Sequence, residues 1–117
     1  MKIEDLKKEI FETASKFPFI KTIHLIDVTD SAVKFRLVID TSTFIQIYHN
    51  ISTETINYVL IHSFQRIYGR DCFDGKWHRH PFENPASHNF STEGSQYITL
   101  FEFMKEIEIY LVEKGLI

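Results

Sequence analysis

The chain has 117 residues, of which 44% are apolar and 15% aromatic, and its formal net charge is −3. This length and apolar content predict one domain with a buried core, and the slight acidity argues against a strongly basic nucleic-acid binder while allowing a local basic patch. The only cysteine, Cys72, excludes an internal disulfide, and no apolar run approaches the length of a membrane span. We therefore expect a single cytoplasmic domain over residues 1–117 that has no membrane partner.

The start of the chain carries apolar residues at helical spacing, which predicts a helix over residues 3–17. Pro18 ends this helix, because the residue before a proline is driven out of helical geometry. Four runs typical of β-strands follow, over about residues 20–28, 33–40, 43–49 and 56–68. The connections between these runs are short, which favours an antiparallel meander.

The end of the chain predicts a second helix with a defined start. Thr99 and Glu102 have the spacing of a capping box, and Gly115 suits the position just after a helix ends. These signals place the helix over residues 100–114. The whole pattern predicts an α+β fold, a mostly antiparallel four- or five-stranded meander flanked by an N-terminal and a C-terminal helix.

Between the last predicted strand and the last helix, residues 69–96 show no regular periodicity. This segment is longer than the roughly 12–15 residues beyond which loops are uncommon and usually functional or disordered. Its aromatic residues, including Trp77 and Phe82, are anchors that a disordered segment would lack. We therefore expect an ordered, His-rich functional loop; the alternative is a fifth strand around residues 77–81.

Two histidines of this segment, His78 and His80, stand two residues apart. In extended backbone such residues point to the same side, about 6.5–7 Å apart, so both rings can reach one ion. His88 is the expected third ligand of zinc or another divalent transition metal. Asp71, Asp74 or Cys72 could supply this third ligand instead of His88. The alternative is that the rings pack on the aromatic residues of the loop and bond to its carbonyl groups.

A second chemistry for the same segment is metal-free cleavage of RNA. His78 and His80 would supply the acid and the base, because histidine titrates near neutral pH. Arg70 and Arg79 would hold the phosphate and Asp71 would orient a histidine or an arginine. The alternative is that these charges pair with one another, as loop charges usually do.

The runs Tyr68-Gly69-Arg70-Asp71 and Trp77-His78-Arg79-His80-Pro81 carry a resemblance to known proteins. They resemble small uncharacterised proteins of archaeal or thermophile type and, more distantly, the TumE-type toxins of toxin–antitoxin systems. Those toxins share an aromatic-x-Arg-x-Asp run that is followed by a His-rich segment. The resemblance implies an RNA-acting toxin whose partner is a cognate antitoxin-like protein.

A function without catalysis is also open. Phe101 and Val112 lie off the main apolar stripe of the predicted C-terminal helix, which favours an interaction module that forms a homo-oligomer or binds a small regulator. The sequence thus supports three hypotheses: an RNA-acting enzyme, an interaction module, and a metal-binding protein.

Overall fold

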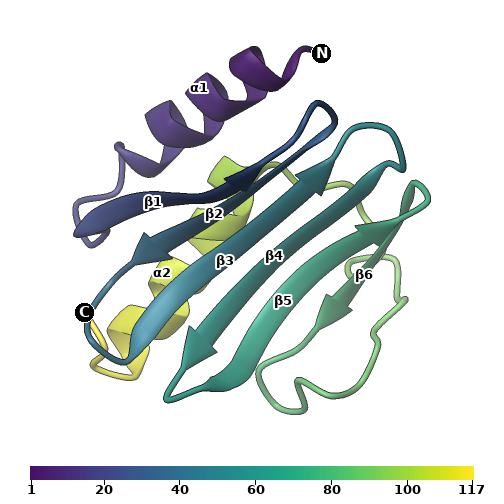
Figure 1. The fold of residues 1–117 in the computed structure, drawn as a ribbon. Helices are drawn as coiled ribbons and strands as arrows, with labels where there is room; N and C mark the ends of the chain where they lie inside the picture. Colours follow the sequence, from purple (N-terminus) through teal and green to yellow (C-terminus); the bar gives the residue numbers. More distant parts are fainter.

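The computed structural model describes residues 1–117 and shows one six-stranded sheet with two helices (Figure 1). Each strand pairs antiparallel with the next, so the order in the sheet follows the chain. The elements are α1 (Ile3–Ala14), β1 (Thr22–Val28), β2 (Ala32–Val38), β3 (Thr43–Asn50), β4 (Thr55–His62), β5 (Gln65–Phe73), β6 (Lys76–His80) and α2 (Leu100–Glu113). Neither helix has the length and apolar character needed to cross a membrane.

The α+β class and the antiparallel meander are confirmed, but the prediction of four or five strands is wrong. The run 56–68 is not one strand: it forms β4 and β5, which are joined by a tight turn. Ser63 and Phe64 occupy this turn with φ of 50° and 66°. Residues of these types seldom adopt positive φ, so a turn could not be predicted at these positions from their residue types.

The first part of the predicted loop 69–96 is also strand, because β5 continues to Phe73 and β6 follows at Lys76. Asp74 and Gly75 connect them with φ of 52° and 77°, as in the Asp-Gly turns favoured in β-hairpins. The alternative of a strand around residues 77–81 is therefore confirmed, and the remaining loop begins at Pro81. The other predicted boundaries agree with the structure to within three residues.

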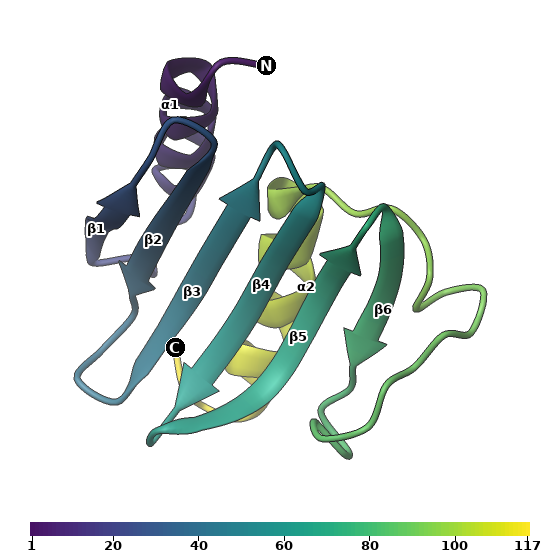
Figure 2. The ribbon, with the colours of Figure 1, turned by 45° about the vertical axis from the view of Figure 1, so that its right-hand side comes forward.

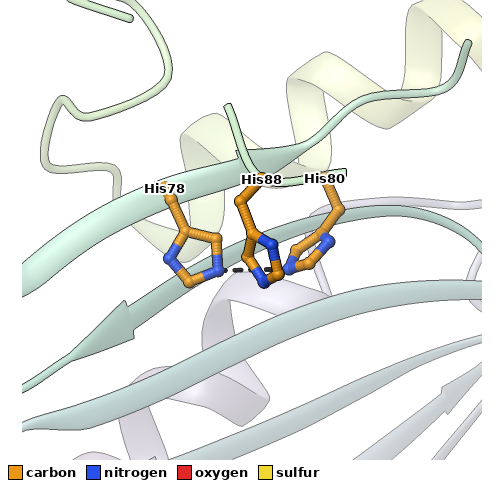
Figure 3. Close-up of side chains that lie close together, drawn as sticks. All are labelled: His78, His80 and His88. Atoms are coloured by element: carbon orange, nitrogen blue, oxygen red, sulfur yellow. Dashed lines mark hydrogen bonds between the residues drawn. The ribbon is translucent and has the colours of Figure 1, made fainter. Parts of the chain in front are cut away.

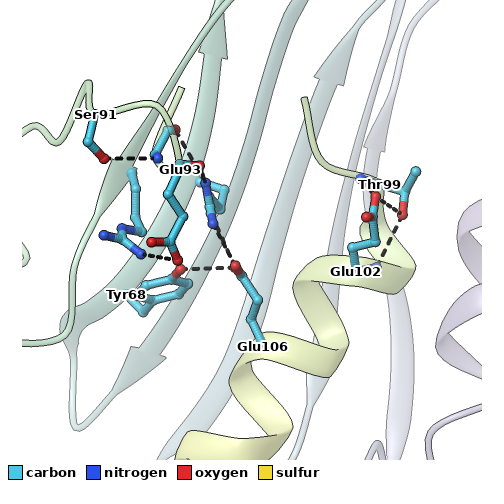
Figure 4. A network of polar contacts seen from close by, with 9 residues as sticks. Tyr68, Ser91, Glu93, Thr99, Glu102 and Glu106 are labelled. Carbon is cyan, nitrogen blue, oxygen red and sulfur yellow. Dashed lines mark hydrogen bonds and ion pairs between the residues drawn. The ribbon is translucent and has the colours of Figure 1, made fainter. Parts of the chain in front are cut away.

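One face of the sheet packs against both helices in a single apolar core. Alternate strand residues such as Phe35, Leu37 and Ile45 point into it, and Phe103 and Ile107 of α2 are fully buried there. The capping box starts α2: the Thr99 hydroxyl accepts from the Glu102 N–H at 3.1 Å, and the Glu102 carboxylate accepts from the Thr99 N–H at 2.9 Å (Figure 4).

The opposite face of the sheet carries no helix (Figure 2). We call this surface the open face. Because side chains alternate along a strand, the neighbours of the core residues lie on it. The register of the sheet assigns to it Lys34, Arg36, Phe44, Gln46, Tyr48, Asn57, Val59, Arg66, Gly69, Asp71, His78 and His80.

Candidate metal centre

Three histidines meet at the β5–β6 end of the open face (Figure 3). His78 and His80 are alternate residues of β6 and therefore point to the same side, as expected. Their cross-strand neighbours on β5 are Asp71 and Gly69. Gly69 has no side chain to cover the His80 imidazole, so both rings have room on the open face.

His88 reaches the two rings because the chain folds back along β6. The Arg79 N–H donates to the Asn89 carbonyl at 3.0 Å, and the Asn89 N–H donates to the Arg79 carbonyl at 2.8 Å. This antiparallel bridge brings the His88 ring centroid to 4.7 Å from that of His80 and 4.9 Å from that of His78. One ligand atom from each of the three histidines lies within 4.8 Å of the others.

Asp71, from β5, lies beside two of the three histidines. Its Oδ2 lies 3.1 Å from His80 Nε2 and 3.6 Å from His78 Nε2, and the two Nε2 atoms are 3.1 Å apart. A tetrahedral ion with bonds of about 2.0–2.1 Å holds its ligand atoms about 3.3–3.4 Å from one another. Three donors from two strands therefore already stand at the spacing that such an ion requires.

The position of the proton on the His80 ring also suits metal binding. Its Nδ1 lies 2.8 Å from the Pro85 carbonyl oxygen, which can only accept, so Nδ1 donates this hydrogen bond. In the neutral ring, Nε2 then presents a lone pair toward His78 and Asp71. A backbone carbonyl that orients the second ring nitrogen is the usual support of a metal-binding histidine.

The side chains of the cluster differ in burial, and burial affects their protonation. His80 is 5% exposed and Asp71 is 9% exposed, whereas His88 lies at the surface. Burial lowers the pKa of His78, although the charge of Asp71 acts in the opposite direction. The neutral ring is the form that binds a metal. Asp71 Oδ1 is buried without a hydrogen-bond partner, and the one arginine near this carboxylate, Arg66, contacts its other oxygen at 3.7 Å, so the buried carboxylate is only partly compensated.

The two arginines expected in a catalytic site lie on the other face of the sheet. Arg70 donates to both carboxylate oxygens of Glu106, at 3.1 and 2.6 Å, and to the carbonyls of Glu93 and Gly94 at 3.0 and 3.3 Å (Figure 4). Burial favours the neutral form of Arg70, but Glu106 outweighs it, and the pKa of Arg70 is raised. Arg70 thus fastens α2 and the loop to the sheet.

Arg79 of β6 is the cross-strand neighbour of Arg70 and therefore points to the same face of the sheet. Its NH1 donates to Glu93 Oε1 at 3.2 Å. The structure therefore divides the predicted catalytic set: Asp71, His78 and His80 lie together on the open face, and the arginines face the helix side. The set is divided because its residues belong to β5 and β6, and the side chains of a strand alternate between the two faces of the sheet.

The remaining candidates do not join the cluster. Cys72 points into the core, and burial raises the pKa of its thiol, so it is unsuited to bind a metal as thiolate. Asp74 is exposed in the β5–β6 turn. A further histidine, His62 at the end of β4, also lies outside the cluster, with its Nδ1 2.7 Å from the Thr43 hydroxyl oxygen.

One cation, Arg66 of β5, lies near the cluster. Arg66 NH1 lies 3.7 Å from Asp71 Oδ2, and the register places Arg66 on the open face. The sequence placed Arg66 on one strand with His62, and the turn at residues 63–64 hid its proximity to Asp71. Recognising β5 as a separate strand would have revealed it.

Comparison of the chain with models of protein families, with curated proteins and with solved structures found no match in any of the three. The resemblance to TumE-type toxins therefore stays a prediction, and the function is argued from the geometry of the site.

Proposed function

We propose that this chain is a transition-metal-binding protein. Its centre takes zinc, or another divalent ion of similar preference, on His78, His80 and His88, and Asp71 Oδ2 completes a tetrahedron. The observation that carries the proposal is the 3.1–3.6 Å spacing of the Asp71 and His78–His80 donor atoms, with His88 beside them.

The chemistry of the donors selects the class of ion. Imidazole nitrogen suits zinc, copper, nickel and iron, whereas calcium and magnesium take oxygen ligands almost exclusively. Three imidazoles and one carboxylate in tetrahedral arrangement favour zinc. A bound cation would also balance the buried Asp71 carboxylate, whose Oδ1 has no partner within the chain.

Four protein donors leave no open position on a tetrahedral ion, which favours a role in holding structure over hydrolysis. The ion would join three pieces of chain: β5 through Asp71, β6 through His78 and His80, and the returning segment through His88. Its main effect would be to fix the segment 81–90 on the edge of the sheet.

Elemental analysis of the untagged protein tests this proposal. We expect about one zinc per chain in the wild type after dialysis against zinc, and none in His78→Ala/His80→Ala. His24→Ala is the matched control, because His24 is an exposed histidine of β1 outside the cluster and should leave the metal content unchanged. A wild type that keeps no metal contradicts the proposal.

Metal-free action on RNA is the second candidate, favoured by one contact. The Asp71 carboxylate lies 3.1 Å from His80 Nε2, and in the protonated ring this N–H would donate to it, which orients the imidazolium as a general acid. Arg66 would then replace Arg70 and Arg79 as the cation that holds phosphate. If chelated wild type and His80→Ala cleave a panel of RNAs equally, this candidate fails. A homo-oligomer and an antitoxin-like partner stay predictions.

A further inference from the structure

We infer that the protein binds a small organic amine, in its ammonium form, in a pocket between the sheet and the two helices. The pocket has a volume of about 310 Å³ and lies on the core side of the sheet. Volumes from about 300 Å³ upward are typical of sites that enclose small ligands. The inference does not depend on the proposed metal centre, because none of the clustered histidines lines the pocket.

The pocket is formed by three elements that are distant in the sequence. One face of α1, the core face of the β3–β4 hairpin and the first turn of α2 all contribute to it. The residues on its walls include Leu6, Glu9, Ile10, His49, Ile56 and Tyr58. Most of the lining side chains are hydrophobic, so they suit the hydrocarbon part of a ligand, while the few polar ones select its polar group.

Tyr58 of β4 brings a buried hydroxyl to this pocket. The residue is 6% exposed, and its ring packs in the core with its centroid 5.4 Å from that of Phe103. The hydroxyl nevertheless forms no hydrogen bond within the chain, whereas the other buried tyrosine, Tyr68, donates to Glu106. Buried tyrosine hydroxyls usually have a partner. Because Tyr58 lines the pocket and its hydroxyl is not sealed in the core, a ligand can supply that partner.

The charge beside this hydroxyl is negative. Burial, the nearby Tyr97 and the Glu9 carboxylate, in that order, raise the pKa of Tyr58. Glu9 forms no ion pair, and no lysine or arginine lines the pocket. The positive end of α2 is already balanced, because the Glu102 carboxylate accepts from the Thr99 N–H at 2.9 Å. The pocket therefore favours a cation over an anion.

Two further groups of the pocket suit an ammonium ion. The Tyr97 ring is largely exposed, so its face is free to contact a cation. Burial lowers the pKa of His49, so its ring is neutral near pH 7 and can accept from an N–H. The Phe101 ring is less available, because Lys16 Nζ lies 5.9 Å from its centroid. An ammonium group thus finds acceptors and an aromatic face, while its hydrocarbon part is covered by the apolar walls.

Isothermal titration calorimetry of the full chain with tryptamine tests the inference, because tryptamine carries an ammonium group on a flat apolar body. We expect one molecule to bind per chain with a Kd below about 1 mM, which small ligands of this size can reach. Indolepropionate has a carboxylate in place of the ammonium group. It should bind at least about tenfold more weakly, because like charges repel.

Two variants locate the site. Glu9→Gln keeps the shape of the side chain and removes its charge, so it should weaken the binding of tryptamine about fivefold or more. Glu12→Gln is the matched control, because Glu12 is an exposed carboxylate of the same helix outside the pocket, and it should leave the affinity unchanged. Tyr58→Phe keeps the ring, removes the hydroxyl and should weaken binding about fivefold.

The metal proposal and this inference can fail separately. His78→Ala/His80→Ala should lose metal and still bind tryptamine as the wild type does. Absence of saturable binding by the wild type, equal affinity for tryptamine and indolepropionate, or equal weakening by Glu9→Gln and Glu12→Gln would each overturn the inference, whatever the metal content.

Discussion

Arg70 of β5 and Glu106 of α2 form the closest ion pair of the chain, with 2.6 Å between Arg70 NH2 and Glu106 Oε2. The Arg70 side chain is only 4% exposed, and Tyr68 donates to the same carboxylate at 2.9 Å. A buried guanidinium that loses its carboxylate keeps its desolvation cost without the compensating attraction. This pair therefore decides how firmly α2 is held against the edge of the sheet.

Glu106→Ala should lower the free energy of unfolding by about 3 kcal/mol, the lower part of the range for breaking a buried pair, since Glu106 is partly exposed. Urea denaturation followed by circular dichroism measures the change. Glu108→Ala is the matched control: it removes the exposed pair with Lys105 and should cost less than about 1 kcal/mol. Equal losses in the two variants would contradict the structural role of the Arg70–Glu106 pair.

The buried hydroxyl of Tyr68 should make the folded protein less stable in alkaline solution. Burial, helped by the charge of Glu106, raises the pKa of Tyr68 from 10.0 to about 12. Because the folded state holds this proton more tightly than the unfolded state, stability is complete below pH 10 and is lost as the pH rises to 12. The free energy of unfolding should fall by about 2–3 kcal/mol, because a pKa that differs by one unit between the folded and unfolded states corresponds to about 1.4 kcal/mol.

Urea denaturation of wild type and Tyr68→Phe between pH 9 and pH 12 checks this expectation. The variant should lose less stability over the interval, although Tyr58, whose pKa burial also raises, keeps part of the slope. Tyr97→Phe is the control, because Tyr97 is 70% exposed and should leave the slope unchanged. Parallel curves for wild type and Tyr68→Phe would contradict the assignment.

Asp71→Asn tests whether the carboxylate belongs to the metal centre. The amide keeps the size of the side chain but removes the charged donor, so the affinity for zinc should fall by more than the about 10–100-fold that follows loss of a supporting group. Competition with a chromophoric chelator measures the affinity. Asp74→Asn, in the exposed turn, should bind zinc as the wild type does. Unchanged affinity in Asp71→Asn would restrict the centre to the three histidines.

The turn between β4 and β5 should be open to stabilisation. Ser63 and Phe64 both have positive φ, which costs about 1–3 kcal/mol for residues of this kind. Ser63→Asn/Phe64→Gly introduces the residues that prefer this geometry and should raise the free energy of unfolding by about 1 kcal/mol or more. Thr41→Asn/Ser42→Gly, at a turn without positive φ, should give no gain. A loss in the first variant would contradict the turn geometry.

The helices and the first strands could be predicted from the sequence, because their signals are local. Thr99 and Glu102 form the expected capping box, and the alternation of β2 follows its burial. The edge of the sheet could not be predicted in the same way. Arg70 interrupts the apolar pattern of the core face, and it is buried only because Glu106 comes from a helix 36 residues further along the chain.

The candidate site could likewise be predicted only where its signals are local. His78 and His80 could be paired from the period of a strand alone, and the structure brings them together. The position of His88 depends on the reversal of the chain after Pro81 and on the bridge to Arg79, which no local pattern encodes. The separation of Asp71 from Arg70 follows from alternation, but only after residues 65–73 are recognised as a strand.

The bridge between Arg79 and Asn89 also bears on how copies of this chain can meet. A strand edge with free N–H and C=O groups is a template for another strand. The returning segment occupies part of the β6 edge, whereas β1 is free and exposes Leu25, Ile26 and Val28. Copies that each have one free sheet edge can associate only in pairs, whereas copies with two free edges can add further copies without limit. The returning segment therefore leaves β1 as the edge at which a second copy of the chain can add a strand, which favours a pair over a fibre.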